Sequence, residues 1–338
     1  MNNLLEIENL STSFFTHVGE VKAVRNISFK LEKGEVLGIV GESGSGKSVT
    51  MLSLMKLLVD TGKIVNGTIM FEKREITKLT NREMKKIRGN DIGMIFQDPM
   101  TSLNPVLTIG NQMVEPLRLH KGMGSEEAKK KAISMLELVG IPNPEKRLKQ
   151  YPHEFSGGMR QRVMIAIALS CQPKLLIADE PTTALDVTTQ AQILELIKEI
   201  KNKINTAIIL ITHDLGIVAD VCDKVNVMYG GCIVEKGDTR DIFYRSRHPY
   251  TWGLLGSIPN PNTLVKERLK PIEGQPPDLL KPPPGCPFAP RCGHAMAVCT
   301  DSMPPEFEIS DTHRSACWLN HPDAPPIKSP IERGYMHE

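Results

Sequence analysis

The chain has 338 residues, enough for a full core domain and a smaller additional region. Apolar residues make up 40% of the chain and charged residues 24%, as is typical of a globular protein. Its 41 basic and 39 acidic residues leave a formal net charge of +2. Because the chain carries no strong positive charge, a nucleic-acid partner is not expected.

The N-terminal segment does not have the pattern of a signal peptide. Residues 1–10 include Glu6 and Glu8 and lack both a basic start and a long apolar run. The most apolar segments of the chain fall well short of the ~20 residues that span a bilayer. We therefore expect a cytoplasmic protein, in which the seven cysteines are thiols or metal ligands rather than disulfides.

A glycine-rich segment lies between an apolar, β-branched run and a segment with a helical pattern. The run is residues 36–40, residues 49–58 follow, and the segment itself reads Gly41-Glu42-Ser43-Gly44-Ser45-Gly46-Lys47-Ser48. Strand, turn and helix in this order are the context in which G-x-x-x-x-G-K-[ST] binds phosphate. A glycine-rich hairpin or linker would require neither the preceding strand nor the Lys-Ser pair.

The residue types in this segment suit a nucleotide triphosphate. Glycines let backbone N–H groups converge on phosphate oxygens at the positive end of the following helix. Lys47 is expected to reach the β- and γ-phosphates, and the Ser48 hydroxyl to bind Mg²⁺.

The segments around this motif predict further strands. Residues 4–10 alternate apolar and acidic side chains, as an edge strand does. Residues 24–31 and 35–40 predict a hairpin that ends at the glycine-rich segment. Phe14 and Phe15 are expected in a polar loop, where an exposed ring could stack on adenine. The alternative is a ring packed beneath a β-hairpin.

Another predicted strand, residues 91–96, is followed by Gln97. Its amide can bind a metal or a water, although a lone glutamine here is more often a turn residue. Residues 109–119 and 125–139 then predict helices, so residues 101–155 form a small helical subdomain inserted into an α/β core. Ser156-Gly157-Gly158 begins the next apolar helix and is a second candidate anion site.

Two carboxylates end the apolar strand that begins at Lys174. Asp179 fits the metal partner of a phosphate loop, and Glu180 is placed to orient or deprotonate an attacking water. The last core strand, residues 206–211, leads to His213, which could contact the γ-phosphate, although a lone histidine is usually structural. Strands alternate with helices throughout, so a mainly parallel sheet covered on both faces is expected.

Six motifs in this order resemble those of the ATP-binding subunit of an ABC transporter. Residues 41–48 resemble Walker A, Gln97 the Q-loop, residues 155–159 the signature, Asp179-Glu180 the end of Walker B, Ala184-Leu185-Asp186 the D-loop, and His213 the switch histidine. The resemblance covers roughly residues 4–256. It implies an α/β P-loop NTPase core of the ABC ATPase type in residues 1–256, with an inserted helical subdomain at about residues 98–164.

The resemblance also implies roles for individual residues. Catalytic roles fall to Lys47, Gln97, Glu180 and His213, and Mg²⁺ binding to Ser48, Gln97 and Asp179. Alignment favours Phe14 over Phe15 as the aromatic that stacks on adenine. The implied ATP contacts are Phe14, Gly41, Ser43, Gly44, Ser45, Gly46, Lys47, Ser48, Val49, Gln97, Ser156, Gly157, Gly158, Asp179, Glu180, Asp186 and His213.

Residues 95–105, 159–162 and 285–292 are similar to the dipeptide/oligopeptide branch of importers, which includes related nickel importers. The signature departs from Leu-Ser-Gly-Gly-Gln, because Phe155 and Met159 flank Ser-Gly-Gly here. The serine hydroxyl and glycine N–H groups remain, so phosphate binding is still expected. Transported solutes are inferred by analogy alone, because the ATPase does not contact them.

The resemblance implies an ATP-hydrolysing motor for peptide import, peripheral to the cytoplasmic face of the cell membrane. Two such subunits, identical or homologous, would sandwich ATP between the Walker A of one and the signature of the other. Two membrane permeases and an extracytoplasmic peptide-binding protein would complete the system. The alternative is a soluble ABC-type ATPase acting on DNA or ribosomes, but such proteins tend to carry two nucleotide domains or a long coiled coil.

Residues 257–338 are expected to form an irregular, proline-rich extension with four cysteines: Cys286, Cys292, Cys299 and Cys317. Four thiols in a segment poor in core residues suggest a metal. Their spacing matches neither the usual zinc pairs nor the bacterial ferredoxin run, which leaves iron–sulfur, zinc and free thiols open. Resemblance to importer subunits that carry these cysteines favours a structural [4Fe–4S] cluster. The other three cysteines are expected to be small buried apolar residues.

Overall fold

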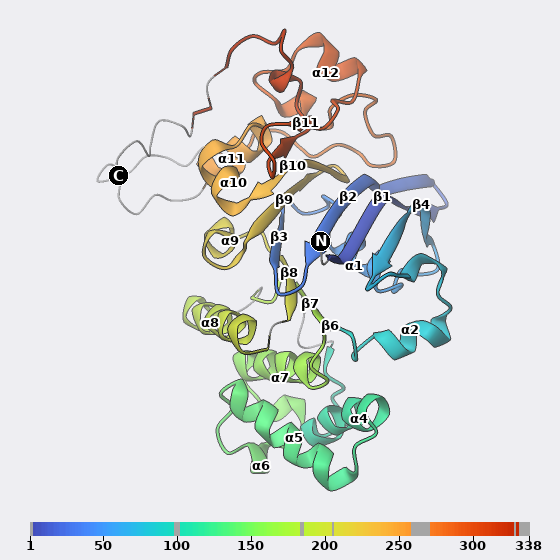
Figure 1. Ribbon diagram of the computed structural model, residues 1–338, viewed down its shortest axis with the longest axis vertical. Helices are drawn as coiled ribbons and strands as arrows, with labels where there is room; N and C mark the ends of the chain where they lie inside the picture. The colour runs from blue at the N-terminus through green and yellow to red at the C-terminus, as the bar shows by residue number, and fades with distance from the viewer. Residues whose placement is uncertain are drawn as a thin grey trace, which may run out of the picture. The chain divides into compact units, whose positions relative to one another are not determined.

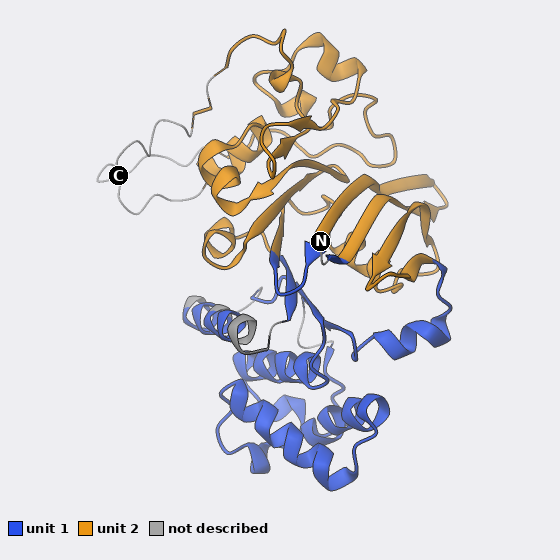
Figure 2. Cartoon of the chain, viewed as in Figure 1, with its two compact units in different colours: residues 1–4, 31–36, 78–211 blue, residues 5–30, 37–77, 212–338 orange. Residues whose placement is uncertain are grey.

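The computed structural model describes residues 3–97, 102–182, 186–204, 206–257, 271–327 and 329–330. It divides into two compact units, which Figure 2 shows in different colours. Unit 1 comprises residues 1–4, 31–36 and 78–211, and unit 2 comprises residues 5–30, 37–77 and 212–338.

Three parallel strands of unit 1 lie in the order β8-β7-β6 (Figure 1). They are β6 (Ile92–Ile95), β7 (Leu175–Asp179) and β8 (Ala207–Ile211). All residues of β7 and β8 are buried, which explains why their sequences are continuous apolar runs. The predicted parallel arrangement is confirmed for these strands. The register pairs Asp179 with Ile211, so the polar residues that follow the strands leave from the same edge.

Helices account for most of the remainder of unit 1. Thr80 and Glu83 form a capping box at the start of α2, and Thr108 caps α4, which ends at Gly122 with φ 65°. Helices α4, α5 and α7 pack together, as the predicted helices at 109–119 and 125–139 imply. The helices are α2 (Asn81–Ile87), α4 (Ile109–Lys121), α5 (Ser125–Leu138), α6 (Pro144–Arg147), α7 (Gly157–Leu169) and α8 (Val187–Ile204), with a 3₁₀ turn at Pro152–Glu154. Another 3₁₀ turn, Ile76–Lys78, has only its last residue in unit 1.

An antiparallel sheet at the N-terminal end of the chain has the order β2-β1-β4-β5. Its strands are β1 (Asn3–Thr16), β2 (Gly19–Glu32), β4 (Gly62–Phe71) and β5 (Arg74–Glu75). Two predictions were wrong here. Residues 4–10 are not an edge strand, because β1 lies between β2 and β4. Residues 24–31 and 35–40 do not form a hairpin, because β2 belongs to this sheet whereas β3 (Val36–Val40) pairs with β9. Alternation reveals a strand but not its neighbours.

The second group of strands in unit 2 has the order β11-β12-β10-β9-β3. Residues 225–229 and 231–235 predict a hairpin. It is confirmed as β9 (Lys224–Tyr229) and β10 (Cys232–Asp238), joined through Gly230 and Gly231 at φ 54° and 80°. Only β3 and β9 among these five strands pair in parallel, so the sheet here is more antiparallel than predicted. The helices of this part are α1 (Lys47–Leu54), α9 (Leu215–Val221), α10 (Thr239–Arg245) and α11 (Pro249–Gly256).

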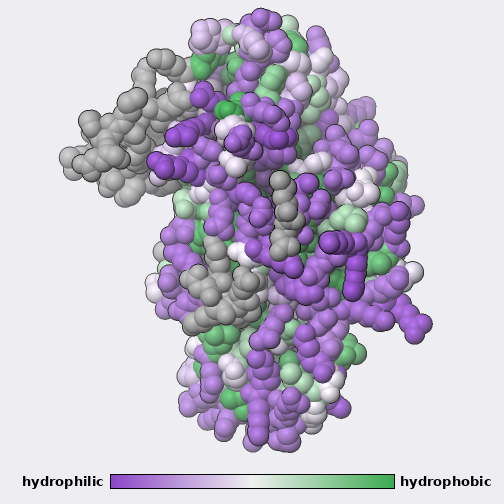
Figure 3. Space-filling model, in the orientation of Figure 1, coloured by the Kyte–Doolittle hydropathy of each residue, from purple (hydrophilic) through white to green (hydrophobic). Residues whose placement is uncertain are grey.

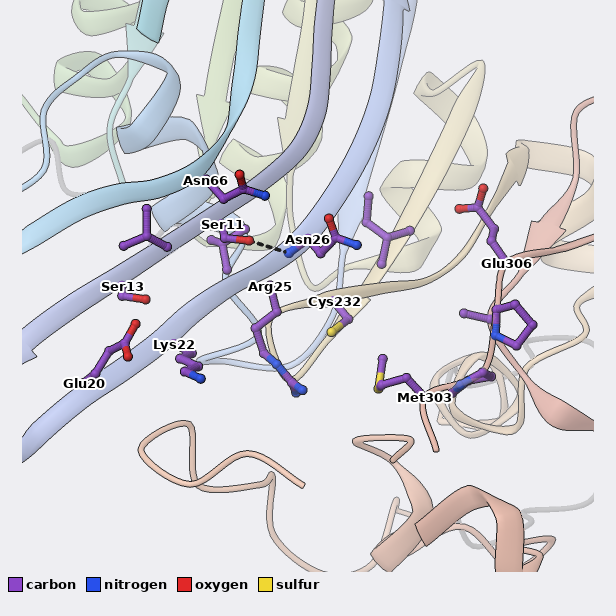
Figure 4. A pocket seen from close by; sticks show the side chains of 16 residues that line it. Ser11, Ser13, Glu20, Lys22, Arg25, Asn26, Asn66, Cys232, Met303 and Glu306 are labelled. Atoms are coloured by element: carbon purple, nitrogen blue, oxygen red, sulfur yellow. Dashed lines mark hydrogen bonds between the residues drawn. The ribbon is translucent and has the colours of Figure 1, made fainter. Parts of the chain in front are cut away.

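The C-terminal extension is less irregular than predicted. The short strand β12 (Arg314–Ser315) pairs with β10, and β11 (Phe307–Glu308) pairs with β12. The extension also contains helix α12 (Ala297–Asp301) and the 3₁₀ turns Ala289–Arg291 and Trp318–Asn320. The extension also runs beside β2, where Lys22 N–H donates to Leu279 C=O over 2.9 Å. A cleft of about 570 Å³ remains between β2 and the extension, lined by residues that include Lys22, Arg25 and Met303 (Figure 4). Residues 258–270, near the start of this extension, lie outside the described residues.

The face of the molecule in Figure 3 is mainly hydrophilic, with hydrophobic side chains in small separate patches. Among the helices of the described ranges, none combines the length and the hydropathy of a membrane span.

Candidate functional site

The predicted phosphate loop in unit 2 is a tight turn between β3 and α1. Gly41 has φ 149° and Gly46, which precedes α1, has φ 100°. A Cβ atom on Gly41 would lie 2.1 Å from the Met228 carbonyl oxygen, and one on Gly46 would lie 2.5 Å from that of Ala23. Only glycine therefore fits these two positions. The loop is consequently held against β2 and β9 by its own backbone.

Lys47 is buried and its ammonium group is directed back onto the loop. Its Nζ donates to the carbonyl oxygens of Gly41 and Glu42 over 2.8 and 2.9 Å, and lies 3.4 Å from Ser45 Oγ. A phosphate could replace these weak neutral acceptors with charged oxygens. Ser43 and Gly44 are exposed, and Ser48 and Val49 are half-buried at the start of α1. The geometry suits phosphate, while each atomic contact with ATP stays a prediction.

Unit 1 brings together two of the predicted catalytic residues. Gln97 follows β6 and Glu180 follows β7, and Gln97 Nε2 donates to Glu180 Oε2 over 2.8 Å. Glu180 has φ 48°, a left-handed conformation that costs about 1–3 kcal/mol in a residue with a side chain. Its N–H donates to Ile211 C=O over 2.9 Å, which fixes the strained residue. Such strain is typical of functional sites.

Asp179 is the last residue of β7 and is buried. A carboxylate at this position, one residue before Glu180, has the hard oxygen donors that Mg²⁺ prefers. The sequence reasoning missed Gln161, a buried residue of α7 whose Nε2 donates to Pro181 C=O over 2.6 Å. This bond fixes the chain just after Glu180. Gln161 lies between Arg160 and Arg162, before the apolar run of the helix begins, so no local signal distinguishes it.

The Ser-Gly-Gly segment lies at the start of α7, as predicted. Ser156 Oγ accepts from Met159 N–H over 3.3 Å, and Ser156 and Gly157 are exposed. A Cβ on Gly158 would lie 2.7 Å from Thr189 Cγ2, so this position also requires glycine. The first N–H groups of a 13-residue helix are thus presented at the surface of unit 1.

Asp186 has a clear local role. Its Oδ1 accepts from Thr189 N–H over 2.9 Å and its Oδ2 from Thr189 Oγ1 over 2.7 Å. These bonds lower the pKa of Asp186 and cap α8. Ala184 and Leu185, the rest of the predicted D-loop, lie outside the described residues. A contact between Asp186 and ATP stays a prediction.

The structure treats the two candidate aromatic residues differently. Phe14 is half-buried and pairs with Gly62 across β1 and β4, with its ring beside the Gly62 backbone. Phe15 is 46% exposed, and the Lys63 ammonium lies 5.8 Å from its ring centroid. Both lie in the end of β1 rather than in a loop, and the choice of Phe14 stays a prediction. His213 is exposed, two residues after β8 ends at Ile211, and its contact with γ-phosphate is likewise untested.

All seven cysteines lie within the described residues, and none of them forms a disulfide. Cys171, Cys222 and Cys232 are buried, as predicted. In the extension, burial raises the pKa of Cys286 to about 11 and that of Cys317 to about 12, and neighbouring thiols of the same group contribute to both increases. Within the described residues, however, no three His, Cys, Asp or Glu side chains are arranged to hold one metal ion.

Comparisons with known proteins agree with this geometry. A family model described as ABC transporter matches residues 24–183, and one described as the C-terminal region of oligopeptide/dipeptide transporters matches residues 234–299. The oligopeptide transport ATP-binding protein OppD of Bacillus subtilis (strain 168) is 57% identical over 98% of this chain and 92% of its own length. The dipeptide transport ATP-binding protein DppD of the same organism is 57% identical over 94% of this chain and 95% of its own length.

A solved structure of the dimeric ATP-binding cassette MJ0796 with ADP and Pi matches with a TM-score of 0.63 and 28% identity, over 70% of this chain and 99% of that one. The fold, together with the phosphate loop and the carboxylates at the strand end, defines a P-loop ATPase of the ATP-binding cassette class. The chain belongs to the ABC transporter ATP-binding proteins, in the branch of the oligopeptide and dipeptide transporters.

Proposed function

We propose that this protein is the ATP-hydrolysing subunit that energises import of dipeptides or oligopeptides through a membrane transporter. The observation that carries this proposal is the 57% identity to OppD of Bacillus subtilis, which extends over 98% of the chain. The match of residues 234–299 to the peptide-transporter C-terminal region supports the same assignment. An ATPase acting on nucleic acid or ribosomes is not supported by any of these relatives.

In the proposed mechanism, Lys47 and the loop N–H groups bind the phosphates, and Ser48, Asp179 and Gln97 would supply oxygen ligands to Mg²⁺. A bound Mg²⁺ would supply positive charge against the negative charge of the phosphates. Glu180 accepts a proton from the water that attacks the γ-phosphorus, while the β–γ bridging oxygen leaves with ADP. The bond from Gln97 orients the Glu180 carboxylate. His213 would contact the γ-phosphate.

The proposed assembly is a head-to-tail pair of identical or homologous subunits. Each ATP would lie between residues 41–48 of one subunit and Ser156-Gly157-Gly158 of the other. Exposure of Ser156 and Gly157 at the start of α7 supports this, because their polar groups are accessible. ATP binding would favour the closed pair and hydrolysis would reopen it.

Two permeases would hold the pair at the cytoplasmic face of the membrane, and an extracytoplasmic binding protein would deliver the peptide. Unit 1 offers a surface for a permease beside α4, where a hollow is lined by residues that include Val114, Leu119 and Met123. Leu119 is 73% exposed and nearby Val106 is 76% exposed. Apolar side chains this exposed are better suited to a protein contact than to water.

Peptide uptake tests the proposal. We expect that deleting the gene abolishes uptake of a labelled dipeptide or oligopeptide by the native cell, and that the wild-type gene restores it while a Glu180→Gln gene does not. A tagged wild-type chain should co-purify from membranes with two permeases. Normal peptide uptake without the gene, or loss of nickel uptake alone, would overturn the peptide assignment.

We further propose that Cys286, Cys292, Cys299 and Cys317 bind a metal centre, of the [4Fe–4S] type by family resemblance. Metal binding would deprotonate these four thiols, because the thiolate is the form of cysteine that binds a metal. Cys286 N–H donates to Cys299 C=O over 2.8 Å, so two of the four residues are already fixed beside each other. The metal centre would then cross-link segments of the extension and stabilise its fold, without taking part in ATP hydrolysis.

Metal analysis after anaerobic purification tests this second proposal. We expect about four iron and four sulfide per wild-type chain, and a large loss of both in Cys292→Ser. Cys171→Ser is the matched control, because Cys171 lies in unit 1 in a cluster with Leu117 and Ala128. Stoichiometric zinc without iron would exclude the cluster, and absence of any metal would overturn the proposal.

A further inference from the structure

One arginine of the extension holds the phosphate loop directly. Arg291 ends the 3₁₀ turn Ala289–Arg291, and its Nη1 and Nη2 donate to Glu42 Oε2 and Oε1 over 2.6 and 3.1 Å. Glu42 is the second residue of the loop. The two residues are 249 positions apart and both lie in unit 2. The sequence reasoning did not connect them.

The guanidinium is fully engaged. Besides Glu42, it donates to Tyr229 Oη over 3.0 Å, Ile272 C=O over 2.9 Å and Glu273 C=O over 2.8 Å. These bonds use all five N–H donors of the side chain, which is only 4% exposed. Arg291 is therefore a buried side chain held in one orientation by its hydrogen bonds, rather than a solvated surface charge.

The backbone of Glu42 is fixed as well. Its N–H donates to Tyr250 Oη over 2.8 Å, and its carbonyl oxygen accepts from Lys47 Nζ over 2.9 Å. Tyr229 and Tyr250 pack with ring centroids 4.5 Å apart, and Phe288 of the extension packs against both at 5.2 and 5.3 Å. The extension thus contributes both a charge and an aromatic ring to the support of the loop.

The charge of Arg291 matters because of what the loop binds. A carboxylate in a loop that binds a polyphosphate would repel the ligand, and a buried, bidentate guanidinium neutralises that carboxylate. It also orders the loop before ATP arrives, which lowers the cost of binding. We propose that Arg291 is a positioning residue of the ATP site, which neutralises Glu42 and preorganises the phosphate loop from the C-terminal extension. This rests on the assignment of residues 41–48 as the ATP-binding loop.

A double-mutant cycle on the full chain tests the proposal. ATP affinity is measured by titration calorimetry without Mg²⁺, so that hydrolysis is suppressed, and ATPase kinetics are measured with Mg²⁺. Arg291→Met should weaken ATP binding about 5-fold or more and raise the KM for ATP with little change in kcat. Adding Glu42→Gln to Arg291→Met should restore most of the affinity, because no unpaired carboxylate remains. Loss through general destabilisation would not be rescued in this way.

Two further variants keep the test decisive. Arg291→Lys retains the charge without the planar fork and should bind ATP better than Arg291→Met. Arg314→Met removes a paired arginine of the same extension, bound to Glu308 over 2.6 Å, and should leave ATP affinity unchanged. Unchanged affinity in Arg291→Met, or no rescue by Glu42→Gln, would overturn the proposal. Failure of the wild-type chain to bind ATP would instead overturn the assignment of the loop.

Discussion

Replacing Glu180 by glutamine is expected to lower ATP hydrolysis by about 10²–10⁴-fold, the usual contribution of a general base, while ATP binding is retained. Glutamine has the same shape and keeps an oxygen that can accept from Gln97 Nε2, which donates to Glu180 over 2.8 Å. The backbone at φ 48° is no more strained by glutamine than by glutamate. Only the basicity toward water is lost. Release of phosphate and equilibrium ATP affinity, measured on the same preparation, check this separation.

The variant should also accumulate the ATP-bound pair, because closure would proceed while reopening requires hydrolysis. Light scattering after size exclusion in Mg-ATP measures the pair directly. Glu195→Gln is the matched control, since Glu195 is an exposed residue of α8 whose carboxylate lies 3.8 Å from Lys198 Nζ. Turnover at the wild-type rate by Glu180→Gln would exclude Glu180 as the base.

The phosphate loop was predictable because its requirements are local. Gly41 and Gly46 must adopt positive φ beside the backbone of Met228 and Ala23, and Lys47 follows at the start of the helix. Because these constraints act on consecutive residues, a short sequence motif is enough to predict the loop. Strands β7 and β8 were equally predictable, because burial on both faces produces an uninterrupted apolar run.

Strand neighbours were not predictable in the same way. The alternation in β1 indicates a half-buried strand, but its partners β2 and β4 are chosen by which apolar faces meet in the folded chain. The predicted edge strand and hairpin were wrong for this reason. The short strands β11 and β12 carry no periodicity at all, because two residues are too few to show any.

The other contacts that the sequence did not predict join residues far apart in the chain. Gln97 and Glu180 could be placed at strand ends, yet only the fold shows the bond between them. Arg291 lies in a segment where proline and cysteine dominate the pattern, and nothing in that pattern indicates a carboxylate 249 residues earlier. Individual residues that support a site from another part of the chain have no local signal.

Replacing Lys47 by alanine is expected to abolish useful ATP binding. Removing one partner of a desolvated charge pair costs about 2–5 kcal/mol. This loss raises the Kd for ATP by roughly 30-fold to several thousand-fold. Lys47 is 5% exposed, so water cannot substitute for its ammonium group at the phosphates. The carbonyl oxygens of Gly41 and Glu42 also lose their donor, which leaves the loop less ordered. Titration calorimetry with ATP measures the loss.

Lys56→Ala is the matched control, because it removes the same charge just beyond the other end of α1, where Nζ donates to Thr77 C=O over 3.1 Å. Both positions lose a lysine, but only Lys47 is directed onto the loop. ATP should therefore raise the melting temperature of the wild type and of Lys56→Ala, and not that of Lys47→Ala. Equal stabilisation of all three by ATP would mean that the loop of residues 41–48 does not hold the phosphates. A lower melting temperature of Lys47→Ala without ATP would instead report the loss of its bonds to Gly41 and Glu42, so the two effects of the substitution are measured separately.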